Sequence, residues 1–379
     1  MFKPVCEYMK TTSELLPFGQ HPSLLKNCTG DSQFLFHEAL LQAELDAKQM
    51  QKAEKVCEFV HNIYEQFLEK AINPEWTRKT VEERKAHIEA LCARPQVEQR
   101  SEAWYKQTAN VLTASEFSTL FGSARQRGNL IQTKVNMVPK EYLPQLAFPT
   151  SQISALTWGI RFEPVIKQML EKKWSAQIKD LGRLTHPNDE HLAASPDGLI
   201  ISTPHRDKLG RLVEIKCPFS RKIGGDIPFD YWVQMQIQME CADIDECEYV
   251  EAEILSLRPD VPTVDVSGCQ YKGIVLLLGN ETDGRYEYEY IGLDADHTAY
   301  SPREGWKIVE TIPWGIHKLH HKVVQRDRSW FQSTEPWRQS FWTDMELARK
   351  GEAWSIPAPA PLPEKVKPKI CLIRDEDTD

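Results

Sequence analysis

Two acidic residues and one lysine stand in a spacing that suits a divalent cation and an attacking water. Asp197 lies in the turn-forming sequence Pro-Asp-Gly, and Glu214 and Lys216 alternate with apolar residues in the run 212–216. Because residues two apart on a strand share a face, Glu214 and Lys216 point the same way. Carboxylates are ligands for hard cations, and a lysine beside them helps to place a water for attack.

Two short strands must bring these groups together. If residues 199–202 pair with residues 212–216 as a hairpin, Asp197 returns close to Glu214, while Val213 and Ile215 face a core. A plainer interpretation stays open, because an Asp-Gly turn and a Glu-x-Lys surface strand are each common in proteins where they have no catalytic role.

Four sequence motifs follow one another along the chain. The central one is Ser-Pro-Asp-Gly at 195–198 followed by Glu-Ile-Lys-Cys-Pro at 214–218. The others are Glu-Ala-Trp-Tyr-Lys at 102–106 with Leu-Thr-Ala-Ser-Glu-Phe at 112–117, Ala-Leu-Thr-Trp-Gly at 155–159 with Arg-Phe-Glu at 161–163, and Tyr-Trp-Val-Gln-Met-Gln at 231–236. In this order, the four motifs resemble the lambda exonuclease family, the YqaJ-type viral recombinases, within the PD-(D/E)xK nuclease superfamily. Any one motif alone is a weak signal, but four in the right order are specific.

The resemblance implies an α/β restriction-endonuclease-like core, a mixed sheet flanked by helices, that hydrolyses phosphodiester bonds with Mg²⁺ or Mn²⁺. The implied substrate is double-stranded DNA, digested 5′ to 3′ for recombination, repair or replication. Alternatives are an endonuclease similar to the herpesvirus alkaline nucleases and a DNA-binding module without catalysis. The residues that match are Glu163, Asp197, Glu214 and the Ile215 carbonyl as metal ligands, Lys216 to orient or activate the water, and Gln234 to hold it.

The same resemblance implies contacts to DNA. In the family, the serine that matches Ser115 lies near the 5′ phosphate, and a hydroxyl at a helix start suits a phosphate; simple capping by Thr113 or Ser115 is the equal alternative. The chain departs from the family at Thr108, where an arginine four residues after the tryptophan is usual, and Lys106, Arg125 or Arg127 are the substitutes to consider. The candidate DNA contacts are Ser115, Lys106, Arg125, Ser195, Arg221 and Lys222.

Composition is that of an ordinary globular protein. The net charge of −9 over 379 residues lowers the expectation of tight nonspecific DNA binding, although a local basic face can still contact phosphates. Nine cysteines without a Cys-x-x-Cys pair or a signal peptide predict reduced thiols and an intracellular protein, in the host nucleus or cytoplasm if viral. No stretch of the sequence is long and apolar enough to predict a membrane-spanning helix. The resemblance favours a protein from a large DNA virus. It also implies a single-strand annealing protein as a partner and assembly into a homotrimer.

Hydrophobic periodicity and turn residues predict three segments. They are a helical extension over 1–95, with helices at 34–72 and 80–91; a nuclease domain over 96–350; and a Pro-rich linker with an acidic, disordered tail over 351–379. Within the nuclease domain, the predicted elements are a helix-turn-helix over 98–121, a long basic loop over 123–150, helices at 158–174 and 228–241, strands at 248–254, 273–278 and 286–291, and a helical region over 301–350.

Overall fold

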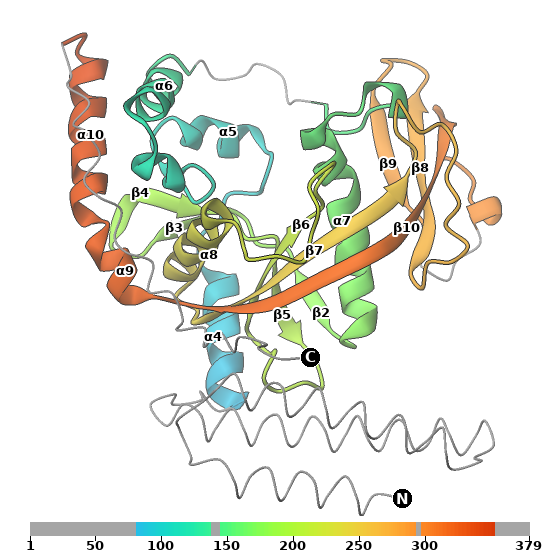
Figure 1. Cartoon of the computed structure of the whole chain (residues 1–379), viewed down its shortest axis with the longest axis horizontal. Coiled ribbons are helices and arrows are strands. Elements are labelled where there is room, and N and C mark those ends of the chain that lie inside the picture. The colour runs from blue at the N-terminus through green and yellow to red at the C-terminus, as the bar shows by residue number, and fades with distance from the viewer. Residues whose placement is uncertain (1–80, 138–144, 293–296, 353–379) are drawn as a thin grey trace, which may run out of the picture. The chain divides into compact units, whose positions relative to one another are not determined.

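The computed structural model describes residues 81–137, 145–292 and 297–352 (Figure 1). The chain divides into two units, Met1–Glu82 and Glu83–Asp379, and the features below belong to the second. The helix predicted at 34–72 and all but the first two residues of the tail predicted over 351–379 lie outside the described residues, so the division at residues 95 and 350 stays a prediction. In the described ranges, no helix is both long and apolar enough to cross a bilayer.

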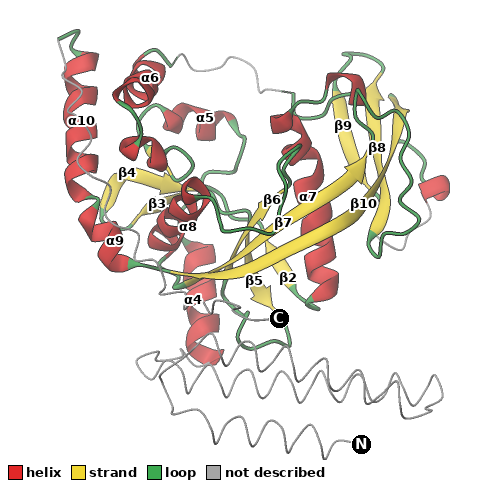
Figure 2. Ribbon diagram, in the orientation of Figure 1, coloured by secondary structure: helices red, strands yellow, loops and turns green. Residues whose placement is uncertain are grey.

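A seven-stranded mixed sheet forms the centre of this unit (Figure 2). Only β6 and β7 pair in parallel, and the other neighbours are antiparallel. The strands in sheet order are β2 (Gln177–Lys179), β5 (Gly198–Ser202), β6 (Leu212–Lys216), β7 (Glu246–Ser256), β10 (Trp306–Gln325), β8 (Lys272–Asn280) and β9 (Tyr286–Tyr290). A smaller sheet contains β1 (Leu112–Thr113), β4 (Asp189–Ala194) and β3 (Leu184–His186).

Two helices cover opposite faces of the large sheet beside β6. Helix α7 (Ala155–Lys173) begins at a Ser154 capping box and buries Phe162 and Ile166 in a core shared with Val213 and Ile215 of β6. Helix α8 (Phe229–Ala242) lies over the other face, where its glutamines reach Glu214 and Lys216. The predicted fold class, a mixed α/β core flanked by helices, is confirmed.

Shorter helices surround this core. They are α4 (Val81–Ala93), α5 (Glu102–Thr108), α6 (Ala124–Val135), α9 (Arg328–Ser333) and α10 (Glu335–Arg349), with 3₁₀ turns at Phe117–Phe121, Thr150–Gln152 and His297–Ala299. The strands predicted near 248, 273 and 286 and the helix from 228 are all present. The helix-turn-helix predicted over 98–121 is instead α5, the short strand β1 and one 3₁₀ turn.

Two further predictions of local structure were wrong. Residues 306–325 were expected to be helical, but they form β10, which pairs with β7 on one side and β8 on the other (Figure 1). Pro313 and Gly315 disfavour a helix there, and strands distant in sequence supply the hydrogen bonds. The basic segment expected to be a loop contains α6, which starts at a Ser123–Gln126 capping box and buries Gly128.

Candidate active site on the β5–β6 hairpin

The hairpin brings Asp197 beside β6. Gly198 pairs with Val213, and the Ile215 N–H donates a 2.7 Å hydrogen bond to Asp197 Oδ2. A Cβ on Gly198 would lie 2.4 Å from Cγ2 of Ile178, so the Pro-Asp-Gly turn needs glycine for close packing against β2. The hairpin expected from the alternating sequence therefore exists and presents Asp197 to the face that carries Glu214.

Glu214 is fully buried, and both of its carboxylate oxygens accept hydrogen bonds. Lys216 Nζ lies 2.5 Å from Oε1, and Nε2 of Gln238 donates to Oε2 at 2.7 Å. Gln238 belongs to α8, one turn beyond Gln234, so a strand and a helix hold this carboxylate between them. Its position is thereby defined before any ligand binds.

Lys216 lies at the centre of the site. Its ammonium group donates to Oε1 of Gln234 at 3.1 Å and lies 4.7 Å from the centre of the Tyr231 ring. Burial lowers the pKa of Lys216, but the negative charges of Glu214 and Asp197 outweigh it and hold that pKa above its usual value. Lys216 is therefore protonated at neutral pH and acts as a hydrogen-bond donor.

Glu163 extends the acidic set from α7. Burial and the neighbouring Glu214 raise the pKa of Glu163, while Arg100 opposes the shift. Burial also raises the pKa of Asp197, as do the charges of Glu214 and Glu163. Three carboxylates thus repel one another at one point of the fold, which is an unfavourable arrangement unless a positive charge compensates it.

The donor set suits a hard divalent cation. Carboxylate and carbonyl oxygens are the ligands that Mg²⁺ and Mn²⁺ prefer, and their mutual repulsion falls when a cation binds between them. Within the described part of the chain, no group of three His, Cys, Asp or Glu side chains is already arranged to hold a metal ion. The fit therefore rests on the chemistry of the oxygen donors and on their crowding.

Arg100 joins the site although no motif marks it. Its guanidinium contacts Glu163 Oε2 at 3.3 Å, and its backbone has φ of +64°, in the left-handed region that disfavours residues with a Cβ. That conformation costs roughly 1 kcal/mol or more. The ion pair between Arg100 and Glu163, whose side chains are 34% and 30% exposed, contributes about 0–1 kcal/mol to the stability of the fold. Arg100 is therefore not explained by its contribution to stability.

The predicted DNA-contact residues differ in exposure and in whether another side chain already pairs with them. Arg125 and Lys222 are exposed, while Lys106 pairs with Glu102 on the same helix. Arg221 forms an ion pair with the buried Glu251, and the Ser195 hydroxyl accepts a hydrogen bond from Trp104 Nε1 at 3.1 Å. Only Arg125 and Lys222 thus present a cation that, among the described residues, has no carboxylate partner.

Ser115 does not cap a helix. It is exposed, and its hydroxyl lies 3.3 Å from that of Thr113, while the five-residue 3₁₀ turn that follows has no side-chain cap. The expectation of a helix cap at Thr113 or Ser115 was wrong, because Thr113 instead hydrogen-bonds Glu116 and its backbone pairs with β4.

Thr108, at the family's arginine position, has a guanidinium beside it from elsewhere in the chain. Arg183 donates to Thr108 Oγ1 at 3.1 Å and to the Trp104 carbonyl at 2.6 Å, and burial lowers its pKa to about 10. Arg127, considered as a substitute from sequence, is buried against Asp344 at 2.7 Å and belongs to the packing of α6. Sequence spacing contained no signal for Arg183, because it lies 75 residues from Thr108.

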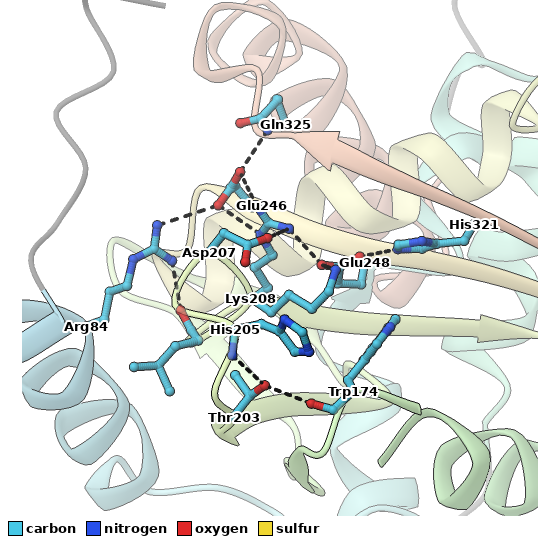
Figure 3. A network of polar contacts seen from close by, with 12 residues as sticks. Arg84, Trp174, Thr203, His205, Asp207, Lys208, Glu246, Glu248, His321 and Gln325 are labelled. Atoms are coloured by element: carbon cyan, nitrogen blue, oxygen red, sulfur yellow. Dashed lines mark hydrogen bonds and ion pairs between the residues drawn. The ribbon is translucent and has the colours of Figure 1, made fainter. Parts of the chain in front are cut away.

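A buried polar network anchors the base of the hairpin (Figure 3). Arg211, immediately before β6, bonds Glu246 at 3.0 Å and Glu248 at 2.8 Å on β7. Burial opposes ionisation of Glu248, but the hydrogen bond from His321 and the charges of Lys208 and Arg211 hold its pKa below its usual range. The network therefore fastens β6, with Glu214 and Lys216, to β7.

Replacing Arg211 tests this anchor. We expect Arg211→Met to destabilise the chain by about 3 kcal/mol, because Glu246 and Glu248 would remain buried without their shared cation. Arg206→Met, in the same connection but exposed, should stay within about 0.5 kcal/mol of wild type. Urea unfolding followed by circular dichroism measures both, and equal midpoints for the two variants would show that the network does not anchor the hairpin.

Comparison with known proteins gives one domain match and one viral relative. Residues 103–245 match the YqaJ-like viral recombinase domain. An uncharacterized protein of Acanthamoeba polyphaga mimivirus is 25% identical over 305 residues, which cover 68% of this chain and 54% of that protein. The chain thus spans about half the length of this curated relative. A relative from a large DNA virus agrees with the expectation from the sequence motifs.

Two solved structures are also similar. The crystal structure of an alkaline exonuclease (LHK-Exo) from Laribacter hongkongensis is 18% identical, with 66% of this chain and 95% of that chain covered and a TM-score of 0.40. A phage related exonuclease from Haemophilus somnus is 11% identical, with 64% and 96% covered and a TM-score of 0.36.

The match to the domain model covers every residue of the predicted catalytic set. Glu163, Asp197, Glu214, Lys216 and Gln234 all lie within residues 103–245, on α7, the β5–β6 hairpin and α8. The order of motifs, the mixed sheet and the domain match agree with one another. Residues 103–245 of this chain are therefore similar to the YqaJ-like viral recombinase domain.

Proposed function

We propose that this protein is a metal-dependent DNA nuclease. The observation that carries the proposal is the meeting of Asp197, Glu214 and Lys216 at the hairpin, with Gln234 hydrogen-bonded to the lysine. Crowded carboxylates beside a protonated lysine suit hydrolysis of a phosphodiester, in which negative charge grows on the phosphate and on the leaving oxygen. The match to the YqaJ-like viral recombinase domain supports the same activity.

In this proposal, Glu163, Asp197, Glu214 and the Ile215 carbonyl would hold Mg²⁺ or Mn²⁺. The bound cation would offset negative charge on the scissile phosphate and the leaving oxygen. The chain itself fixes the positions of the ligands. The Ile215 N–H donates a hydrogen bond to Asp197, and Nε2 of Gln238 donates one to Oε2 of Glu214. Ligands fixed in advance need no reorganisation during the reaction.

Lys216 and Gln234 would place the attacking water. The ammonium group is held between Glu214 and Gln234, so an N–H remains to donate to a water or to a phosphate oxygen. Lys216 would stabilise developing negative charge and would not accept a proton, because the adjacent carboxylates favour its protonated form.

Double-stranded DNA, digested 5′ to 3′ for recombination, is the proposed substrate. This direction and a single-strand annealing partner follow from the family resemblance, as does a homotrimer that would keep the enzyme on its substrate. Residues 103–245 match a domain described as a viral recombinase, which supports a recombination role.

A cleavage assay tests the proposed function. The purified chain is incubated with linear duplex, closed circular duplex and single-stranded DNA, in Mg²⁺, Mn²⁺ or EDTA. We expect Mg²⁺-dependent digestion of the linear duplex to mononucleotides and no cutting of the closed circle. Cutting of the circle would make the protein an endonuclease with the same site, and absence of cleavage on all substrates would leave a DNA-binding module.

The preference for a phosphorylated 5′ end tests Ser115 and Arg125. We expect wild type to digest a 5′-phosphorylated duplex faster than an unphosphorylated one, because a hydroxyl and a free guanidinium can bind a terminal phosphate. Ser115→Ala combined with Arg125→Ala should equalise the two rates and leave basal cleavage. Arg206→Ala, another exposed arginine, serves as the control. Equal rates on both ends in wild type would contradict the end-recognition role.

A further inference from the structure

We propose that the Arg100 guanidinium contacts a backbone phosphate of the DNA next to the scissile bond. This inference rests on the proposed function and deepens it by adding a substrate-contacting residue. Arg100 lies outside residues 103–245 and outside every motif described above. Three observations carry the proposal: its fixed position beside the acidic set, its unused donors and its strained backbone.

The backbone on both sides of Arg100 is fastened. The Gln99 side chain donates to the carbonyls of Leu181, at 3.0 Å, and Pro196, at 3.1 Å, and Pro196 directly precedes Asp197. On the other side, Ser101 caps α5 by accepting a hydrogen bond from the N–H of Trp104. Arg100 is therefore held at a defined place beside the turn that carries Asp197.

The guanidinium retains donors for a further acceptor. Within the described residues, it donates only to Glu163, through Nη2 at 3.3 Å, although arginine carries five N–H donors. The side chain is about one-third exposed, so those donors are accessible. Its positive charge partly offsets the rise in the pKa of Glu163. It also opposes the rise in the pKa values of Tyr105 and Tyr290. A planar cation with free N–H groups beside crowded carboxylates matches a phosphate oxygen of the substrate.

The backbone argues against a purely structural role. At a φ of +64°, glycine would be unstrained, and the partly exposed ion pair to Glu163 returns too little to offset the strain of arginine. Strained residues that persist in a fold cluster at functional sites. The other described non-glycine residues with positive φ are Ser175 and Asp243, and Ser175 directly follows Trp174, the C-cap of α7. Ser175 thus offers a control with matched backbone strain.

Replacing each residue by glycine separates function from stability. We expect Arg100→Gly to lower kcat/KM on linear duplex roughly 100-fold, as removal of one preorganised donor does. Its melting temperature should stay equal to or above that of wild type, because the strain is relieved. Ser175→Gly should also not lower the melting temperature and should leave kcat/KM unchanged. Arg100→Lys, which keeps the charge but not the planar fork, should fall between wild type and Arg100→Gly.

DNA binding without turnover provides a readout independent of cleavage. In EDTA, Arg100→Gly should bind a duplex oligonucleotide more weakly, and the slope of log Kd against log salt concentration should fall by about one. The proposal is overturned if this slope and the cleavage rate both match wild type, or if Arg100→Gly loses activity only in proportion to a lower melting temperature. If wild type cleaves no DNA, the proposed nuclease function fails, and the salt slope alone then decides whether Arg100 contacts phosphate.

Discussion

Asp197→Asn and Glu214→Gln should each lower the rate of DNA cleavage by more than about 10³-fold, while duplex binding in EDTA survives. Both substitutions remove a charge and keep the size of the side chain. Asp197→Asn leaves an oxygen for the Ile215 N–H, so the turn can keep its conformation. Each variant would have one anionic ligand fewer to hold a divalent cation, and negative charge on the phosphate would be less well compensated.

Stability should move in the opposite direction from activity for Asp197→Asn. Burial and the charges of Glu214 and Glu163 raise the pKa of Asp197, so the ionised carboxylate opposes folding at neutral pH. In EDTA, removing that charge should leave the melting temperature unchanged or raise it. Because this pKa is raised in the folded state, the same linkage predicts that wild type gains stability as the pH falls through that pKa toward the lower pKa of the unfolded chain.

Asp260→Asn provides the matched control for these variants, because Asp260 is exposed in the connection between β7 and β8. Its cleavage rate should equal that of wild type. Cleavage within a few-fold of wild type in either Asp197→Asn or Glu214→Gln would remove that residue from the metal site.

Lys216→Gln should lower kcat by about 10²- to 10³-fold with little change in the Mg²⁺ concentration that gives half-maximal rate. The ammonium group contacts Glu214 and Gln234 and would act on charge that develops in the transition state, so its loss should appear in the rate and not in substrate binding. Steady-state cleavage at several DNA and Mg²⁺ concentrations separates these quantities.

Lys173→Gln is the control for Lys216→Gln, since Lys173 is exposed in the last turn of α7 and is not among the candidate site residues. Circular dichroism of both variants is measured beside the kinetics. If Lys216→Gln unfolds, the lysine serves mainly to neutralise the buried Glu214, and its assignment to the reaction is wrong. A large shift in the Mg²⁺ dependence would instead make Lys216 a determinant of metal binding.

The hairpin and its polar face were predictable from sequence because the forces that form them are local. A Pro-Asp-Gly turn bends the chain, and strict alternation in β6 sends Val213 and Ile215 to the core and Glu214 and Lys216 to the other face. The same holds for α7, whose apolar periodicity defines its buried side. Helix α8 is buried all round over residues 235–242, so helical spacing determines only that Gln234 and Gln238 share a face.

Only the tertiary structure decided the residues whose roles depend on distant partners. β10 is a strand because β7 and β8 pair with both of its edges, and Arg127 and Lys134 are buried because Asp344 and Glu116 neutralise them. These partners are set by long-range packing, which no short window of sequence records.

Arg100 and Arg183 show the same division within the site. Each guanidinium approaches its contact, Glu163 or Thr108, across more than 60 residues of chain. The sequence by itself determined which carboxylates and which lysine share one strand face, because alternation on a strand is local. The tertiary structure decided which cations and amides surround them, because electrostatic contacts depend on distance in space and not on separation along the chain.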